Sequence, residues 1–337
     1  MLNFELVDHP VYDGAELQWF DDQVHGTGML AFLSRRGSGR VDYYLQSGLR
    51  LERSGYEIGG GIGSWTEIDF EVARLSVADD GVAAEVRFTD LDGRAVEVRV
   101  DDRDGRLRHP AGLLAPVSAA IERPTSLLLV WMPRFDLVRT TGTPPVIRID
   151  GADVSPGRLP ARRLHRRHLI KYAAPLVSVE LNRTSHDGTP PAAAADQRVR
   201  LDRDGRVREV SAERAGHRAR LLLDPALPDL AGLANGSTAS GRWHVEVDEV
   251  RLTGGSWSAA RAGDDVTVGL DVDERWSPGR LPWLMRLVTT VVPVFRRWPT
   301  TYRWRADVHL GAEPTITAGW ERTDGDRGGG YRRVTGS

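Results

Sequence analysis

An arginine and an aspartate lie two residues apart at the end of an apolar run. The run occupies 127–132 within SLLLVWMPRFDLV, and apolar residues at every position predict a strand covered on both faces. Because side chains alternate along a strand, Arg134 and Asp136 would project to the same side. The apolar neighbours of Asp136 favour the neutral form of a carboxyl group, which a general acid needs. We therefore take Asp136 and Arg134 as candidate catalytic residues; the alternative is a structural ion pair between them.

A second group of candidates is aromatic and apolar, and it centres on LPWLMRLVTTVVPVFRRWPTTYRWR at 281–305. Pro282 suits the first turn of a helix and Pro293 ends or kinks one, so a short helix is predicted near 281–295, inserted between two strands. Its apolar stripe is expected either to plug the core or to cover an apolar ligand. The stripe consists of Leu284, Leu287, Val288 and Val291. Aromatic rings give apolar ligands a broad, rigid contact surface. The candidate substrate-binding residues are Trp131, Trp283, Leu287, Phe295, Tyr302 and Trp304.

Two further polar features leave alternatives open. Lys171 is the only lysine; if buried it could form a Schiff base or act as a general base, and otherwise it is a surface residue. Predicted strands also carry polar side chains on the faces opposite their apolar ones, and these either point into a cavity or face solvent. They are Asp271, Asp273, Asp307 and His309.

The motifs give little support to a metal or nucleotide cofactor. Asp-x-Asp-Gly occurs without the flanking acidic residues of calcium loops, so hairpin turns are expected at 90–93, 102–105 and 202–205. His165 and His168 have a spacing that zinc sites use, but the arginines around them would repel a cation. GGGIGSW at 59–65 precedes a strand-like segment, which favours a bend or a close backbone approach over dinucleotide binding. The chain has no cysteine, and we expect neither a metal nor a cofactor.

The elements that must position these residues are mainly antiparallel strands. Apolar and polar residues alternate over 82–88 and again over 96–100, which is typical of half-buried strands. Asp-Gly turns separate such runs, so 65–108 is predicted to form successive hairpins. The same alternation recurs at 243–252, 265–276 and 302–310.

The length of 337 residues and the Pro/Gly-rich stretches between 141 and 197 favour two domains. We expect an N-terminal antiparallel β domain over 1–155, a linker and crossover segment over 156–197, and a Trp-rich C-terminal antiparallel β domain over 198–337. The predicted fold class is all-β, with two tandem antiparallel units, each a barrel or a sandwich, and one short inserted helix.

Composition narrows the classes of partner. The net charge of −2 provides no basic field for nucleic acid. No run approaches the 18 or so apolar residues of a membrane span, and the first residues lack the features of a signal peptide. Together with the lack of cysteine, these features favour a cytoplasmic protein. The oligomeric state is left open.

Three Gly-x-Trp stretches, at 63–65, 241–243 and 255–257, are similar to the strand-start motif of lipocalins. With two antiparallel β units in one chain, the sequence resembles the tandem lipocalin-like (calycin) superfamily, which includes carotenoid 1,2-hydratase, attachment-type proteins and lipocalin-like Diels–Alderases. The resemblance concerns architecture, and no catalytic residue is carried over from it. It implies a cofactor-free protein that shapes an apolar small molecule within or between barrels.

These observations favour a cofactor-independent cyclase, isomerase or hydratase that acts on an apolar polyketide, isoprenoid or polyene in secondary metabolism. A preorganised pocket would fold the substrate, and a carboxyl group with one or two hydrogen-bond donors would complete the chemistry. The alternative is a non-catalytic carrier of a lipid-like ligand, which needs the same hydrophobic pocket but no acid. A carbohydrate-active epimerase would need a polar cleft with paired carboxylates or histidines, which the sequence does not assemble.

Overall fold

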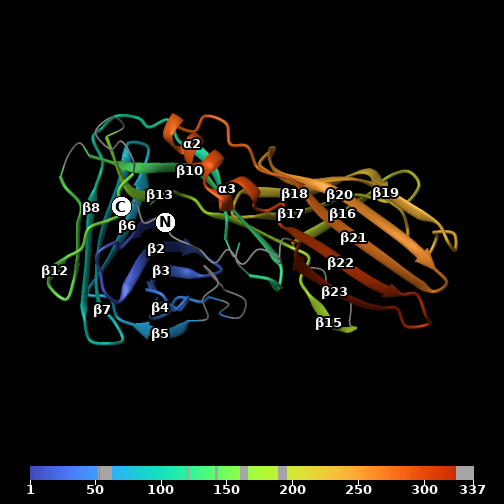
Figure 1. Ribbon diagram of the computed structural model, residues 1–337, viewed down its shortest axis with the longest axis horizontal. Coiled ribbons are helices and arrows are strands. Elements are labelled where there is room, and N and C mark those ends of the chain that lie inside the picture. The colour runs from blue at the N-terminus through green and yellow to red at the C-terminus, as the bar shows by residue number, and fades with distance from the viewer. Residues whose placement is uncertain are drawn as a thin grey trace. The chain divides into compact units, whose positions relative to one another are not determined.

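The computed structural model describes residues 1–51, 53, 63–117, 119, 121–140, 143–159, 166–188 and 196–323 (Figure 1). The described chain is mostly β-strand, with two short helices. Adjacent strands are antiparallel in nearly all pairs, and β4 and β5 form a parallel pair. The predicted antiparallel β class is therefore confirmed. The strand orders have two free ends in each sheet, and no closed barrel is found in the described residues.

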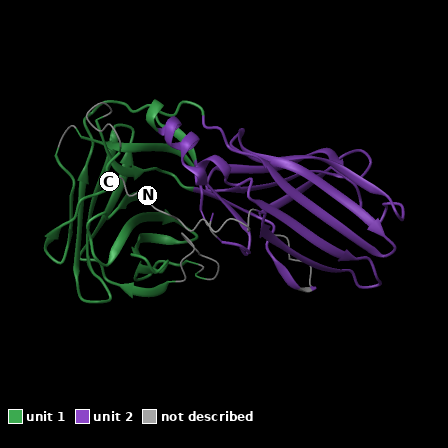
Figure 2. Cartoon of the chain, viewed as in Figure 1, with its two compact units in different colours: residues 1–113, 132–176, 279–284 green, residues 114–131, 177–278, 285–337 purple. Residues whose placement is uncertain are grey.

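The chain divides into two compact units, each assembled from separate stretches of sequence (Figure 2). Unit 1 comprises residues 1–113, 132–176 and 279–284, and unit 2 comprises 114–131, 177–278 and 285–337. The expected division placed a linker at 156–197, but this region contains three strands that join sheets. They are β13 (Arg167–Tyr172), β14 (Val177–Leu181) and β15 (Ser185–Gly188). Pairing of β13 with β1 and of β15 with β23 assigns the region partly to each unit.

The first sheet of unit 1 runs in the order β10-β13-β1-β2-β3-β4-β5. Its remaining strands are β1 (Leu2–Glu5), β2 (Tyr12–Asp22), β3 (Gly26–Arg35), β4 (Val41–Gln46), β5 (Ser64–Ile68) and β10 (Leu127–Arg139). The second half of β10 pairs with β13, whereas residues 127–131 of β10 pair with β14 within unit 2. β9 (Ala111–Ala115) also pairs with β10.

The second sheet of unit 1 contains the predicted hairpins. Its order is β12 (Ala152–Asp153), β11 (Val146–Ile149), β8 (Ala95–Asp101), β7 (Gly81–Thr89) and β6 (Val72–Ala78). Hairpins form at Asp80-Gly81 and Asp92-Gly93, as expected. The expected meander over 65–108 is too long, however. At the start of this range, β5 pairs with β4 in the other sheet. At its end, the residues after Asp104-Gly105 do not pair with β8, and the second neighbour of β8 is β11.

The core of unit 1 lies between these two sheets. The alternation in β7 places Val82, Val86 and Phe88 on the inner face, each at most 1% exposed. Leu2 and Phe4 from β1 pack into the same cluster. Both sheets thus bury one face.

Unit 2 is built around one large antiparallel sheet with the order β15-β23-β22-β21-β20-β19-β18-β17-β16. Its strands beyond β15 are β16 (Gln197–Leu201), β17 (Val207–Arg214), β18 (His217–Leu227), β19 (Thr238–Val247), β20 (Val250–Ala262), β21 (Asp265–Glu274), β22 (Tyr302–His309) and β23 (Thr315–Arg322). Sequential strands from β16 to β23 are spatial neighbours, because each is joined to the next by a short connection or by the helical insertion.

The Gly-x-Trp stretches mark positions where backbone and ring approach closely. Trp243 and Trp257 are 0% and 2% exposed in the core of unit 2. A Cβ atom at Gly255 would lie 1.7 Å from the carbonyl oxygen of Asp271, and one at Gly63 would lie 1.6 Å from that of Val41. Only glycine fits there, which agrees with the close backbone approach expected at Gly63; residues 59–62 of the same stretch lie outside the described residues.

The predicted helical insertion lies between β21 and β22 as two short helices, α2 (Trp283–Val291) and α3 (Pro293–Arg297). Pro293 occupies the first turn of α3, which explains the break between the two helices. The predicted apolar stripe splits into two. Leu284 faces inward at 4% exposure, whereas Leu287 and Val291 are 49% and 63% exposed. Neither helix, nor any other described helix, has the length and apolar character needed to cross a bilayer.

Candidate functional site

A cleft of about 320 Å³ opens in unit 1, where the end of β6 approaches β10 and β13. Most of the exposed area of its walls is apolar, as in typical small-molecule sites, although six of the ten lining residues have polar or charged side chains. The lining residues are Val77, Ala78, Asp79, Leu107, Arg108, His109, Pro110, Arg134, Asp136 and Tyr172. The cleft therefore contains both of the residues predicted to be catalytic, Arg134 and Asp136.

Strand register explains why Asp136 meets a tyrosine in this cleft. Asp136 on β10 lies directly opposite Tyr172 on β13, so their side chains project to the same face of the sheet. The Tyr172 hydroxyl donates to Oδ2 of Asp136 over 3.5 Å, and the Leu137 N–H donates to Oδ1 over 2.8 Å. The Asp136 side chain is 12% exposed, and Nε of Arg167 lies 3.8 Å from its Oδ1. One carboxylate oxygen is thus held by the backbone, and the other faces Tyr172.

Arg134 shares the cleft but does not bind Asp136 as the structural-pair interpretation required. Its guanidinium forms an ion pair with Asp79, which follows the last residue of β6 and has a side chain that is 70% exposed. Asp136 is therefore left to Tyr172, Leu137 and Arg167. Arg134 and Asp79 therefore contribute an ion pair to the wall of the cleft.

Tyr172 is a hydrogen-bond donor in this site. Burial raises the pKa of its hydroxyl group, and the negative charge of Asp136 raises it further. The phenol therefore stays protonated at neutral pH. A protonated hydroxyl beside a carboxylate can donate to a substrate oxygen while the carboxylate accepts or returns a proton.

A buried ion pair adjoins the cleft, because one of its members, Arg108, is a lining residue. The Arg108 side chain is 4% exposed, and its Nη2 lies 3.4 Å from Oδ1 of Asp102, which is fully buried. Nε of Arg108 donates to the carbonyl oxygen of Asp80 over 2.6 Å, and the main-chain N–H of Arg139 donates to Oδ1 of Asp102 over 3.1 Å. Burial raises the pKa of Asp102 to about 6, against the opposing effect of Arg108, and the charge of Asp136 also contributes to the rise.

Sequence reasoning missed Asp102 because it begins an ordinary turn motif. In the Asp-x-Asp-Gly turns at 90–93 and 202–205, Oδ1 of the first aspartate accepts main-chain N–H groups two and four residues later, each over 2.9 Å. Those two turns confirm the hairpin prediction. In the turn at 102–105, the carboxylate of Asp102 instead accepts a hydrogen bond from β10. Only tertiary structure distinguishes the three copies. Tyr172 was missed because its partner strand is distant in sequence.

The aromatic candidates lie elsewhere in the described chain. Trp131 is buried in the core of unit 2 and packs edge-on against Trp276, with ring centroids 5.7 Å apart. Tyr302 is 2% exposed, and its hydroxyl donates to the carbonyl oxygen of Ile121 over 2.6 Å. Trp304 is partly buried against the same core. These three side chains fill the interior of unit 2.

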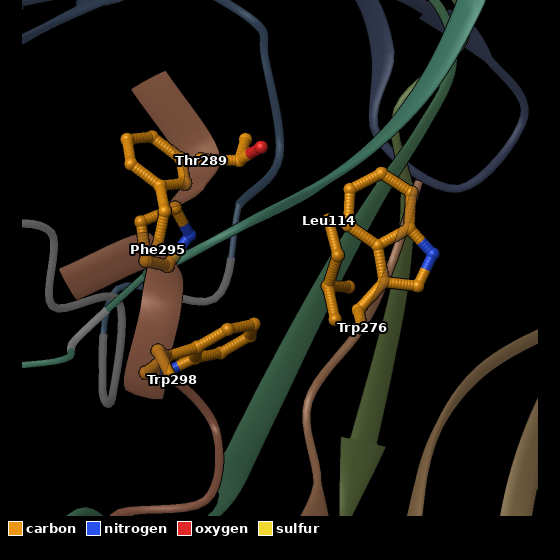
Figure 3. A pocket seen from close by; sticks show the side chains of 6 residues that line it. Leu114, Trp276, Thr289, Phe295 and Trp298 are labelled. Atoms are coloured by element: carbon orange, nitrogen blue, oxygen red, sulfur yellow. The ribbon is translucent and has the colours of Figure 1, made fainter. Parts of the chain in front are cut away.

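Phe295 borders a cavity of about 10 Å³ in unit 2 (Figure 3). This volume holds about one water molecule, so it gives no room for an organic ligand. The other lining residues are Leu114, Pro116, Trp276, Thr289 and Trp298. Trp283 and Leu287, which were expected to border a ligand cavity with Phe295, are 58% and 49% exposed on α2.

The second polar set forms surface pairs on unit 2. Asp273 binds Arg242 through two hydrogen bonds of 2.7 and 2.8 Å. His309 lies 2.8 Å from Asp265, and Asp307 accepts a hydrogen bond from Thr267 over 3.1 Å. Asp271 pairs with Arg303. These exposed or half-buried pairs agree with the solvent-facing alternative.

Lys171 occupies a polar row on the opposite face of the sheet from Tyr172. The residues paired across the strands are Lys171 with Asn3 and Asn3 with Glu16. Burial lowers the pKa of Lys171, and the charges of Glu5 and Glu16 oppose that effect. Nζ of Lys171 donates to Oδ1 of Asn3 over 3.4 Å. Because adjacent residues alternate faces, Lys171 cannot share the cleft of Tyr172.

The described residues contain no group of three or more metal-ligating side chains. His165 of the zinc-like pair lies outside the described residues, and His168 is half-buried on β13. Comparisons with protein-family models, curated proteins and solved structures find no match to this chain.

Proposed function

We propose that the cleft of unit 1 binds a small, mainly apolar molecule and that Asp136 and Tyr172 perform cofactor-independent acid–base chemistry on it. The observation that carries the proposal is the convergence of a half-buried carboxylate and a protonated phenol in an apolar cleft. The volume of about 320 Å³ lies near the lower end of the range for ligand pockets, about 300–1,000 Å³.

The geometry supports an isomerisation through proton transfer. The carboxylate of Asp136 takes a proton from a carbon next to a substrate carbonyl group, and the electron pair moves onto the carbonyl oxygen. Tyr172 donates a hydrogen bond to that oxygen as negative charge develops. Asp136 then returns the proton to a different carbon, so that no atom or electron is gained or lost. The Leu137 N–H fixes the carboxylate during both transfers.

The distance between Asp136 and Tyr172 suits this division of roles. Their oxygen atoms are 3.5 Å apart, longer than the usual 2.5–3.0 Å or so of an O–H···O hydrogen bond. A substrate oxygen can therefore replace the carboxylate as the acceptor of the Tyr172 hydrogen bond without breaking a strong interaction. Cyclisation of a polyene or polyketide chain would use the same carboxyl group and the same hydrogen-bond donor, and hydration would add a water molecule.

Solvent-deuterium incorporation tests the proposal. The protein is incubated in deuterated water with a panel of small cyclic ketones, β,γ-unsaturated ketones and polyene acids, and mass spectrometry detects exchange or rearrangement. We expect activity in the wild type that is lost in Asp136→Asn and strongly reduced in Tyr172→Phe. The matched control Asp273→Asn changes a surface carboxylate of unit 2 and should keep full activity.

Displacement of 1-anilinonaphthalene-8-sulfonate, a fluorescent apolar anion, reports binding in the same panel. If compounds bind the wild type and Asp136→Asn equally and neither protein converts them, the protein is a ligand carrier and the proposed enzymatic activity is wrong. Compounds that neither bind nor react would contradict the site itself.

The family and location are part of the same proposal. We propose that the units are lipocalin-like, which the sequential antiparallel order from β16 to β23 and the buried Trp243 and Trp257 support. A cytoplasmic location fits the lack of cysteine. Comparison of a crystal structure with tandem lipocalin-like proteins would test the proposed family. Cell fractionation would test the proposed location.

A further inference from the structure

Helix α2 has apolar side chains around much of its surface, and only some of them are buried. With about 3.6 residues per turn, Trp283, Leu287 and Val291 fall along one side of the helix. They are 58%, 49% and 63% exposed. Leu284 and Met285, the next two residues around the helix after Trp283, are each 4% exposed. Two apolar residues of the helix are thus buried, whereas three others remain accessible to solvent. We call Trp283, Leu287 and Val291 the exposed ridge.

Such a ridge is uncommon on a protein surface. Single exposed apolar residues are ordinary, but adjacent ones that include a tryptophan indicate contact with another apolar phase. The core of unit 2 has taken up most of the other tryptophans nearby: Trp298 is 4% exposed and Trp320 is 2% exposed. Trp283 is the only tryptophan among the large apolar side chains that are exposed in the described residues.

The charged residues of the segment that contains the ridge have one sign. Residues 275–305 contain seven arginines and no aspartate or glutamate, although the whole chain carries a net charge of −2. Arg303 and Arg305, at the end of this segment, pair with Asp271 and Glu321 of neighbouring strands. The other five are exposed and occur before, within and after the ridge in sequence. They are Arg275, Arg280, Arg286, Arg296 and Arg297.

We propose that the exposed ridge docks on an anionic lipid surface. Trp283, Leu287 and Val291 would enter the boundary between headgroups and acyl chains, and the arginines would contact the anionic headgroups above it. A short helix with apolar residues on one side and basic residues beside them is typical of helices that lie in the plane of a membrane. Tryptophan favours that boundary because its ring is apolar and its N–H is polar.

The length of α2 excludes insertion across the bilayer. Its nine residues extend about 13 Å, less than half of the ~30 Å hydrocarbon core. An acidic protein surface would also attract the arginines, but it would need an apolar groove that matches the ridge. A lipid surface needs no such groove, because headgroups and acyl chains adapt to the side chains. This proposal does not depend on the chemistry of the cleft.

Vesicle flotation tests the proposal with the full chain. We expect binding to vesicles of phosphatidylcholine mixed with phosphatidylglycerol, weak or no binding to phosphatidylcholine alone, and loss of binding as salt screens the charges. The double variant Trp283→Ser/Leu287→Ser should reduce the partition coefficient at least about tenfold. Arg280→Gln should reduce it about fivefold, as expected for one arginine near a charged bilayer.

The matched control is Val24→Ser/Leu91→Ser. These residues are 55% and 46% exposed, like the ridge, but they lie beside aspartates in unit 1. The control should bind vesicles as the wild type does, and circular dichroism should show that all variants fold. The proposal is overturned if the wild type ignores phosphatidylglycerol vesicles, or if the ridge variant and the control bind equally well. Binding of polyglutamate through the ridge, with no binding to vesicles, would assign the surface to an acidic protein instead.

Discussion

The cleft of unit 1 and the aromatic interior of unit 2 differ in how much volume they leave open. Both lie within antiparallel β architecture, and unit 2 contains most of the tryptophans. Yet the larger space, about 320 Å³, is in unit 1, and the cavity beside the aromatic residues of unit 2 holds about 10 Å³. Large rings such as Trp243 and Trp257 are buried between elements of unit 2, and protein interiors are generally close-packed. Aromatic content here indicates a filled core.

Polar residues distinguish the two regions in the same way. The acidic residues of β21 in unit 2 form exposed or half-buried pairs, as Asp273 does with Arg242. In unit 1, Asp136 and Tyr172 are partly or fully removed from solvent, and Asp102 is fully buried next to Arg108. Burying polar groups costs free energy, so their concentration beside an open cleft favours a functional interpretation.

The largest difference is expected when the carboxylate of the cleft is removed. Asp136→Asn keeps the size of the side chain but can neither take nor return a proton, so turnover of a panel substrate should fall about 100- to 10,000-fold. Steady-state kinetics measure this loss. Asp273→Asn, the corresponding change in unit 2, should leave the rate unchanged, and equal losses in both variants would contradict the assignment.

Truncating a side chain of the aromatic core should reduce stability and leave ligand binding unchanged. Trp243 is fully buried, and its Nε1 donates to the carbonyl oxygens of Ser256 and Asp271 over 3.1 and 3.2 Å. Trp243→Ala should therefore lower the free energy of unfolding by about 3–5 kcal/mol, as measured by urea denaturation. Ligand binding by the folded fraction should persist. If Trp243→Ala loses ligand binding with little loss of stability, the ligand site lies in unit 2 and the assignment to unit 1 is wrong.

The buried carboxyl group should give unit 1 a dependence of stability on pH. The pKa of Asp102 is about 6 in the folded protein, above its ordinary 3.8, so between about pH 4 and pH 6 the folded state binds this proton more tightly than the unfolded chain. The free energy of unfolding should then fall as pH rises through that window, by at most about 3 kcal/mol. Asp102→Asn should abolish this component of the pH profile. Asp202→Asn, in the equivalent turn of unit 2, should retain it.

Narrowing the cleft should have the smallest effect of the four. Ala78 is exposed at its edge, so Ala78→Trp should weaken binding of panel compounds about tenfold by occupying volume, with little change in stability. Titration of 1-anilinonaphthalene-8-sulfonate fluorescence measures it. Ala260→Trp, at an exposed position of β20 in unit 2, is the control. An identical affinity in both variants would show that the probe does not use the cleft.

The parts of the fold and site that the sequence predicted depend on local periodicity. Alternation over 82–88 correctly identified the buried face of β7, and the two-residue spacing correctly placed Arg134 and Asp136 on one side of β10. Proline positions predicted the helical insertion, because they act on the local backbone.

The remaining features depend on contacts between distant residues. Tyr172 reaches Asp136 through a register set by strand pairing 36 residues away, and no local pattern encodes that register. Asp102 differs from Asp90 only in what surrounds its turn. The stripe on α2 split because helical periodicity identifies apolar positions but does not show which of them another element covers.

A crystal structure of the protein soaked with the tightest-binding panel compound tests the central claim most directly. The account predicts electron density in the cleft of unit 1, with a ligand oxygen within hydrogen-bond distance of the Tyr172 hydroxyl and a carbon facing Oδ2 of Asp136. Density among the aromatic residues around Trp276 and Phe295, with an empty cleft, would contradict it.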